Sequence, residues 1–424
     1  MKRTVRWGLW GLATVFGVVL VSIIIGMLWF DPARYQQQLE QRVSTLTGRA
    51  FTIHGKLSWR LGSMVTVHVP QLRLANSSAF SINQPFMELS QATVRIALWP
   101  LLRRQVQLGA LDVQGLHVQL QRNVAGEDNW SDLLQLLNDD DGSGFKFVSL
   151  AGLQLHQAQF SYTDVSNDSE LHLSTVTMQL GLFGYEQSTP VSLQGLLSVT
   201  PELQINTQLS SVLQVAADAS KLSANDTQVA LHLIRSGTPM PPLLASVKQV
   251  SWDRLTDQLH IQGTELTTVA AQLTTEVTIR QLMTAPLLAA TIDVTVPQLQ
   301  ELARQWHMTL PVTKDPTVLN AASAHLQLDT TSRAGQMKIS RLQLDDTRYQ
   351  GEFTWSYPDH PTLTFNLHAD RLDLDRYLAP VKDAPPQAVP LQWLQQLQAR
   401  GSLTINDAWW RGIHAQQLTL DVGT

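Results

Sequence analysis

Apolar and polar residues alternate at a period of two along most of the chain beyond Gly48. The clearest runs lie at 57–61, 65–69, 116–120, 171–173, 176–180, 326–328, 342–344 and 372–374. Such alternation is typical of β-strands with one apolar and one polar face. Short segments rich in Asn, Asp, Ser and Gly separate the runs, as expected for turns. The pattern therefore predicts a mainly β body of antiparallel strands that is solvated on one face.

A helical period appears just before the first strands. Pro32 suits the first position of a helix and Gly48 suits its end. Between them, one apolar stripe is formed by Tyr35, Leu39, Val43 and Leu46. We expect this stripe to pack against the first strands. Contact with a membrane surface is the alternative.

Three further short helices are predicted. They lie at 129–137, with Ser131 as a candidate cap, at 299–306 and at 390–398. Helices of about 12 residues do not alternate with the strands, which argues against a doubly wound α/β fold.

The first 30 residues read as a membrane anchor. Residues 7–30 carry no charge and have aromatic residues at both ends. As a helix they would span about 36 Å, slightly more than a hydrocarbon core of about 30 Å. Lys2, Arg3 and Arg6 precede the span, so the positive-inside rule places residues 1–6 in the cytoplasm. The sequence predicts a single-pass protein whose body lies across the membrane.

Composition narrows the function classes. Hydrophobic residues make up 44% of the chain and charged residues 15%, which argues against intrinsic disorder. The net charge of -5 gives no basic footprint for nucleic acid. The chain has no cysteine, which excludes a disulfide, a thiolate zinc site, a catalytic thiol and an acylated cysteine.

No motif for catalysis, metal binding or cofactor binding stands out. The twelve histidines are scattered and form no HxH, HExxH or HxxxH pattern, and several lie on the polar phase of a strand, as His68, His117 and His172 do. Phosphate-binding and nucleophile-elbow motifs are absent from the sequence. We therefore predict no catalytic, cofactor-binding or metal-binding residues, and no cofactor.

Two sets of residues are candidates for chemistry. The acidic residues Asp345, Asp346, Asp373 and Asp375 could suggest a hydrolase, but we expect the first two to diverge and the others to lie on a solvated face. Trp409-Trp410 could stack on a ligand, although packing far from the membrane is preferred. The sequence predicts that the protein is not an enzyme.

A weak internal repeat with an offset of 75 residues is also visible. Residues 286–294 match 361–369, and residues 297–303 match 372–378. If the repeat is structural, it favours a stack of similar β-units over one closed globule.

A set of short motifs in fixed order resembles the AsmA family. After the anchor come Asp31-Pro32-x-x-Tyr35, Thr47-Gly48-Arg49, Ile53-x-Gly55-x-Leu57-Ser58-Trp59, Leu72-Arg-Leu-Ala-Asn76, Asn129-Trp130-x-Asp132-Leu133, Leu150-x-Gly-Leu to Tyr162-x-Asp164, Leu344-Asp-Asp-Thr-x-x-x-Gly351 and Asp370-Arg-Leu-Asp-Leu-Asp-Arg-Tyr377. The resemblance implies an elongated, twisted antiparallel β-sheet groove of the kind found in bridge-like lipid transfer proteins. It carries no catalytic residues over to this chain.

This resemblance and the composition shifts suggest a division of the chain. It comprises a cytoplasmic tail (1–6), an anchor (7–30), an AsmA-like β module with short helices (31–138), an acidic flexible linker (139–146), a repeating β-groove body (147–378), a Pro-rich loop with a short helix (379–400) and the start of a further β unit that we expect to be incomplete (401–424).

The expected function follows from the apolar face of the strands. That face could pack against a second sheet, or it could remain an open gutter that shields lipid tails from water. With the resemblance, we expect an inner-membrane protein with a periplasmic body that supports phospholipid transport and outer-membrane lipid homeostasis. Its partners would be phospholipids, the inner membrane and envelope proteins at the distal end, with no nucleic acid. The alternative is a scaffold or regulator of outer-membrane protein assembly that carries no lipid.

Overall fold

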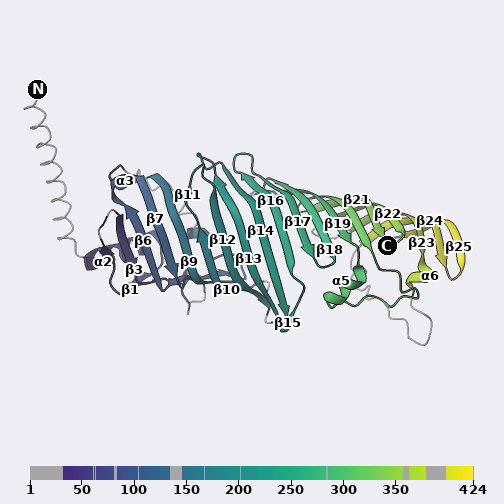
Figure 1. The fold of residues 1–424 in the computed structure, drawn as a ribbon, viewed down its shortest axis with the longest axis horizontal. Coiled ribbons are helices and arrows are strands. Elements are labelled where there is room, and N and C mark those ends of the chain that lie inside the picture. Colours follow the sequence, from purple (N-terminus) through teal and green to yellow (C-terminus); the bar gives the residue numbers. More distant parts are fainter. Residues whose placement is uncertain are drawn as a thin grey trace, which may run out of the picture. The chain divides into compact units, whose positions relative to one another are not determined.

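The fold is described from a computed structural model (Figure 1). It describes residues 32–60, 62, 64–80, 84–103, 105–133, 146–166, 168–200, 202–282, 285–331, 333–356, 362–378 and 398–423. The chain divides into two compact units, 1–177 and 178–424, and strand β10 (Ser169–Leu180) runs across the division. The predicted anchor at 7–30 and the acidic linker lie outside the described residues, apart from Lys146. No helix within the described ranges is long and apolar enough to span a membrane.

The first unit begins with helix α2 and a set of short strands. They are α2 (Pro32–Thr47), β1 (Phe51–His54), β2 (Ser58–Arg60), β3 (Met64–Val69), β4 (Gln71–Leu74), β5 (Met87–Leu89), β6 (Gln91–Ala97), α3 (Leu98–Leu102), β7 (Gln105–Gln114), β8 (His117–Arg122) and the long β9 (Lys146–Asp164). Helix α2 starts at Pro32 and ends before Gly48, which has a φ of 66°, as the sequence predicted. Helix α3 was not predicted.

Strand β9 joins two branches of sheet in this unit. Its first half pairs with β7, which continues through β6 and β3 to β2, and its second half pairs with β8, which continues through β5 and β4 to β1. Gln157, at a φ of 53°, separates the halves. The two branches share one core, because Val67 and Val69 of β3 pack against the buried Phe51 and Leu74.

Helix α2 seals the free edge of β1 with polar side chains. Gln36 Nε2 donates to the carbonyl oxygen of Ile53 at 2.9 Å, and the Ile53 N–H donates to Glu40 Oε1 at 3.0 Å. One turn further, the Phe51 N–H donates to Ser44 Oγ at 3.0 Å. A spacing of four residues on the helix places these side chains on one face.

The predicted apolar stripe of α2 is therefore only partly correct. Val43 packs against the core of the first unit, whereas Leu39 and Leu46 are exposed. The helix packs on the first strands, as preferred from the sequence, but side-chain hydrogen bonds to the edge of β1 set which face points inward.

The predicted helix at 129–137 appears as a helical turn at residues 131–133, and the rest of it lies outside the described residues. Its cap is Asp128 rather than Ser131. Asp128 Oδ1 accepts from the Trp130 and Ser131 N–H groups at 3.1 and 2.7 Å.

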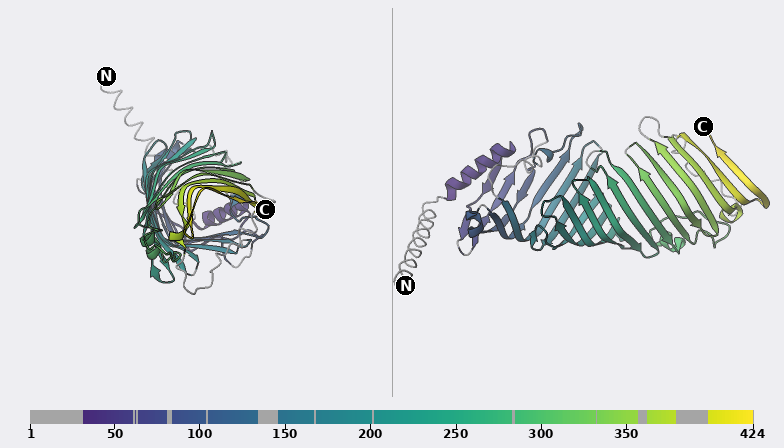
Figure 2. Two further views of the ribbon diagram at one scale, coloured as in Figure 1. Left: turned by 90° about the vertical axis from the view of Figure 1, so that its right-hand side faces the viewer. Right: turned by 90° about the horizontal axis from the view of Figure 1, so that it is seen from above.

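The second unit is one layer of long strands in sequence order (Figures 1 and 2). They are β11 (Phe183–Gly184), β12 (Thr189–Thr200), β13 (Leu203–Val215), β14 (Lys221–Arg235), β15 (Thr238–Pro239), β16 (Leu243–Asp253), β17 (Gln258–Thr268), β18 (Ala271–Arg280), β19 (Leu287–Val296), β20 (Ala322–Thr330), β21 (Ala334–Leu344), β22 (Thr347–Ser356), β23 (Thr362–Asp373), β24 (Gln398–Trp410) and β25 (Ile413–Val422). From β12 on, each long strand pairs with the next along the chain. The strands curve and the sheet twists (Figure 2), as L-residue strands do.

The mainly β class is confirmed, but the pairing is not wholly antiparallel. Strand β9 runs parallel to β7 and β8, and β24 runs parallel to β23. A parallel neighbour needs a long connection, and in both places a long stretch of chain precedes the parallel strand. The alternating pattern does not distinguish the two directions, so it could not reveal these exceptions.

The internal repeat corresponds to a strand followed by a short helix. Helix α5 (Leu299–Gln305) follows β19, as predicted, and α6 (Leu374–Tyr377) follows β23. Four antiparallel pairings separate β19 from β23, so the two strands run in the same direction. Both helices therefore lie on the side of the sheet where these strands end (Figure 1). The predicted helix at 390–398 lies outside the described residues except for Gln398, which begins β24.

Candidate functional site

The strand register of the second unit aligns apolar residues into continuous rows. One row, which we call the central row, crosses every long strand from β12 to β25. It consists of Leu193, Leu209, Val229, Ala245, Leu266, Leu273, Val294, Ala324, Leu342, Tyr349, Ala369, Ile405 and Leu418. Because side chains alternate between the two faces of a strand, the whole row lies on one face. We call this the apolar face and the opposite side the polar face.

No second layer covers the apolar face within the described residues. Ala369 and Ile405 are buried, but the other members of the central row are only half-buried. In a two-sheet sandwich, the inner-face residues would be packed to the density of a protein interior. The half-burial here arises from neighbours in the same sheet, so the face remains accessible.

Register shifts keep the apolar face continuous where the pleat is interrupted. An extra residue in β14, opposite Ser211, and one in β17, opposite β18, shift the pairing. On one side of the bulges the apolar face is formed by odd-numbered residues of β14 and β16, such as Val229 and Ala245. On the other side it is formed by even-numbered residues, such as Ala224 and Val250. Asp226 and Gly263, with φ values of 50° and 60°, mark the change.

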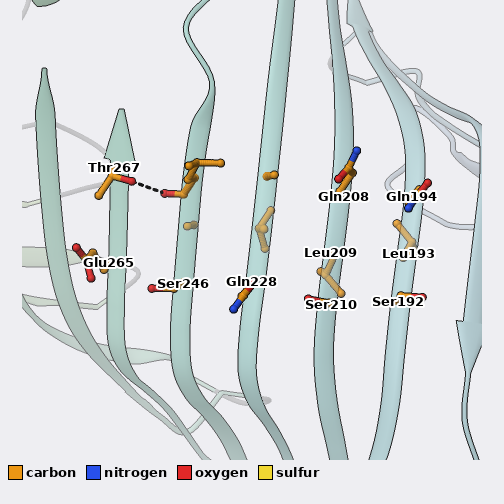
Figure 3. A pocket seen from close by; sticks show the side chains of 14 residues that line it. Ser192, Leu193, Gln194, Gln208, Leu209, Ser210, Gln228, Ser246, Glu265 and Thr267 are labelled. Atoms are coloured by element: carbon orange, nitrogen blue, oxygen red, sulfur yellow. Dashed lines mark hydrogen bonds between the residues drawn. The ribbon is translucent and has the colours of Figure 1, made fainter. Parts of the chain in front are cut away.

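The polar face carries hydroxyl and amide side chains. A shallow depression of about 510 Å³ on this face is lined by Ser192, Gln194, Gln208, Ser210, Gln228, Ser246, Glu265 and Thr267, among others. Figure 3 shows these side chains on the near side of the strands, with Leu193 and Leu209 behind the ribbon. The depression is thus separated from the apolar face by the sheet itself, and it does not bring together groups suited to acid–base or nucleophilic chemistry.

Asp345 holds the loop that follows α5 against the turn between β21 and β22. It lies in the β21–β22 turn at a φ of 51°, and its carboxylate accepts the backbone N–H groups of Leu319, Asn320 and Ala321 at 2.6, 2.8 and 3.1 Å. The Tyr377 hydroxyl donates to the same carboxylate at 2.9 Å. Burial alone would raise the pKa of Asp345, but these hydrogen bonds lower it below its ordinary value.

Arg376 of α6 ties the neighbouring acidic residues together. Its guanidinium lies 2.7 Å from Asp315 and 3.1 Å from Asp346. The pKa of Asp315 is lowered to about 2, first by hydrogen bonds from Thr317 and then by Arg376. Asp345 and Asp346 lie in the turn between β21 and β22 rather than along a strand, and each contacts α6, Asp345 through Tyr377 and Asp346 through Arg376.

Asp373 and Asp375 act as caps rather than as merely solvated residues. Asp373 Oδ1 accepts the Asp375 N–H at the start of α6, at 3.1 Å. Asp375 accepts the N–H groups of Arg411 and Gly412 in the β24–β25 turn at 2.6 and 2.9 Å. All four acidic candidates thus have structural hydrogen-bond partners, which single-residue alternation could not predict.

The histidine and tryptophan candidates are also placed by the structure. His325 Nδ1 lies 2.7 Å from Asp293 Oδ1, and His414 Nε2 lies 3.0 Å from Asp407 Oδ1. Trp409 stacks on His414 with ring centroids 4.5 Å apart, while Trp410 is exposed. Among the described residues, no group of three or more His, Asp or Glu side chains could hold a metal ion.

Comparison with known proteins adds one positive finding. The sequence model of the AsmA family matches residues 1–384. No curated protein and no solved structure matches the chain.

Proposed function

The chain belongs to the AsmA family, and from this membership and the uncovered apolar face of its second unit we propose that it shields lipid acyl chains from water at the cell envelope. The observation that carries the proposal is the central row, which is apolar in every strand from β12 to β25. A 16-carbon chain costs about 13 kcal/mol to expose to water, at about 0.8 kcal/mol per CH₂. A lipid conduit therefore needs unbroken apolar cover.

The length of the row suits transport rather than storage of a single molecule. Thirteen strands spaced about 4.8 Å apart extend the row over roughly 58 Å. The protein would be held in the inner membrane by residues 7–30, with its body in the periplasm, and would support phospholipid transport and outer-membrane lipid homeostasis. Neither a metal nor a cofactor enters this function, and the chain would not act as an enzyme.

Site-specific photo-cross-linking in cells tests the proposal. A benzophenone amino acid at Leu273 would sit in the central row, and the same probe at Gln272 would sit on the polar face of the same strand, β18. We expect phospholipid to cross-link to the Leu273 probe and not to the Gln272 probe. Protein adducts without lipid at Leu273 would instead support the scaffold for outer-membrane protein assembly.

A further inference from the structure

Exposed apolar side chains gather at the edge of the second unit that carries α5 and α6 (Figure 1). Met308 and Val312 lie in the loop after α5, Leu378 directly follows α6, and Trp410 and Ile413 flank the β24–β25 turn. All five side chains are exposed to solvent. We call these five residues the edge patch. Single exposed apolar residues need no explanation, but a group of them on one surface marks an interaction site.

Hydrogen bonds hold the three segments of the edge patch together. The Lys314 N–H donates to the carbonyl oxygen of Leu378 at 2.8 Å, and the Asp315 N–H donates to that of Arg376 at 3.1 Å. These bonds join the loop after α5 to α6. Asp375 of α6 in turn accepts the N–H groups of the β24–β25 turn at 2.6 and 2.9 Å. The edge patch is therefore one surface of the fold and not a set of side chains on separate loops.

The β24–β25 turn presents an aromatic, an aliphatic and a cationic side chain together. Trp410 and Ile413 are direct partners in the strand register, so their side chains lie next to each other on one face of the hairpin. The Arg411 guanidinium lies over the Trp410 ring, 5.3 Å from its centroid. Because Asp375 accepts the N–H groups of Arg411 and Gly412, the turn can leave water without unpaired backbone donors. This combination is typical of segments at the interface between lipid and water.

The charges beside the edge patch favour an anionic partner. The acidic side chains of this edge are engaged by the chain itself, as Asp315 is by Arg376 at 2.7 Å and Asp375 is by the backbone of the turn. Lys314 and Arg411 are exposed, and neither forms an ion pair with another residue that the structure describes. Two cationic side chains therefore remain available at the surface, next to the exposed apolar residues.

We propose that the edge patch docks on the surface of an anionic lipid bilayer. The apolar side chains enter the interfacial layer, where the Trp410 ring lies at the level of the headgroups, and Lys314 and Arg411 bind lipid phosphates. This contact is additional to the anchor expected at residues 7–30. It recognises the membrane surface and not acyl chains on the apolar face, so it does not depend on the proposed function.

A single fluorescent reporter tests the docking, because the chain contains no cysteine that would also be labelled. The full chain with Ile413→Cys, labelled with a polarity-sensitive dye and held in phosphatidylcholine nanodiscs, would be mixed with vesicles that contain phosphatidylglycerol. We expect the emission to rise several-fold and to shift to the blue, because the dye leaves water. The same dye on Leu255→Cys is the control and should not respond. Leu255 is 75% exposed, compared with 67% for Ile413, but it lies in the β16–β17 turn at the opposite edge of the sheet.

Two further pairs of substitutions separate the apolar and the cationic contributions. With the reporter at position 413, Met308→Ser made together with Val312→Ser should lower the response several-fold, whereas Leu255→Ser should leave it unchanged. Lys314→Gln made together with Arg411→Gln should remove the preference for phosphatidylglycerol vesicles over pure phosphatidylcholine vesicles. Raising the salt concentration should weaken the same preference in the unmodified chain.

The result that would overturn the inference is no emission change at position 413, or an equal change at position 255. A photoreactive residue at Val312 in cells gives a second readout. Lipid adducts there would support the inference, and protein adducts alone would show that the edge patch binds a protein instead. Lipid cross-linking at Leu273, on the apolar face, reports on the proposed function separately and should persist in the Met308→Ser, Val312→Ser variant.

Discussion

Nη2 of Arg49 lies 2.7 Å from Oδ1 and 2.8 Å from Oδ2 of Asp132, and it also donates to the carbonyl oxygen of Asn129 at 2.7 Å. The arginine side chain is 2% exposed and the aspartate side chain 52%. The guanidinium also lies over the Phe86 ring, 4.9 Å from its centroid. This pair joins the end of α2 to the turn that follows β8, and so connects two of the short motifs that carry the family resemblance.

The unequal burial of this pair predicts unequal effects of mutation. Asp132→Asn leaves a buried guanidinium without its counter-charge and should destabilise the protein by about 2–4 kcal/mol. Arg49→Met leaves only a half-exposed carboxylate, which water can solvate, and also removes the unpartnered Nε and Nη1 atoms. We expect Arg49→Met to be milder, and the double variant to resemble it. Chemical denaturation of the three variants measures this, and additive effects would show that the pair is not coupled.

Glu40 is expected to matter for the edge of β1. Its Oε1 accepts the Ile53 N–H and also lies 3.3 Å from Gln36 Nε2, so Glu40→Ala leaves an edge N–H without its partner. The expected loss is about 1–3 kcal/mol, whereas Glu40→Gln keeps an acceptor and should lose less. Gln41→Ala, at an exposed position one residue later, serves as the control. Faster hydrogen exchange at Ile53 in Glu40→Ala, but not in Gln41→Ala, would confirm the role of α2.

Gly351 should tolerate no side chain. Its φ is 149°, and an added Cβ would lie 2.0 Å from the carbonyl oxygen of Asn366 on β23. Gly351→Ala must therefore push β22 away from β23, and we expect a loss of about 2–4 kcal/mol or failure to fold. Gly62→Ala is the control, because a Cβ there would meet its first neighbour at 3.6 Å. Similar thermal unfolding of both variants would contradict this account.

The sequence predicted the strands well and their surroundings poorly. The alternation at 326–328 and 342–344 identified β20 and β21 because a single sheet with one solvated face leaves that pattern in each strand. It could not place Asp345 against the loop at 319–321, because that contact depends on a turn and a helix distant in sequence. The parallel pairing of β23 and β24 was missed for the same reason: pairing direction depends on the connection, not on strand composition.

Alternation could not decide either whether a second layer covers the apolar face. An apolar strand face reads the same whether another sheet or a lipid covers it. The central row was equally invisible, because Ala245, Leu266 and Leu273 become neighbours only through the register of β16, β17 and β18.

Acid should destabilise the loop that follows α5, at residues 306–321. The folded pKa of Asp315 is about 2, below its ordinary 3.8, and the pKa of Asp345 is also lowered. A carboxyl group whose pKa is lower in the folded than in the unfolded state stabilises the folded state above about pH 4. This contribution is lost as the pH falls from about 4 towards 2. We expect hydrogen exchange of residues 306–321 to rise over this range. Thr317→Val removes the hydroxyl that contributes most to the low pKa of Asp315, so the rise should begin at a higher pH, and an unchanged profile would contradict the assignment.

A charge placed in the middle of the apolar face tests whether lipid moves along it. Leu326 lies on the apolar face of β20, and Gln327 lies on the polar face. Leu326→Asp puts a carboxylate where an acyl chain would have to pass, and an unpaired charge in apolar surroundings is strongly unfavourable. Photoreactive residues at Leu209 on β13 and Leu403 on β24 then report on the two sides of the block.

If lipid enters at one end and slides, Leu326→Asp should reduce lipid cross-linking at one reporter several-fold and leave the other near its original level, and the reporter that loses signal identifies the far end of the path. Gln327→Asp should change neither reporter, because its side chain lies on the other face of the sheet. Equal cross-linking at both reporters in Leu326→Asp would show that lipids bind locally without passing β20. The fold would then be a row of separate acyl-binding positions rather than a conduit, because the same apolar face would serve each lipid where it lands.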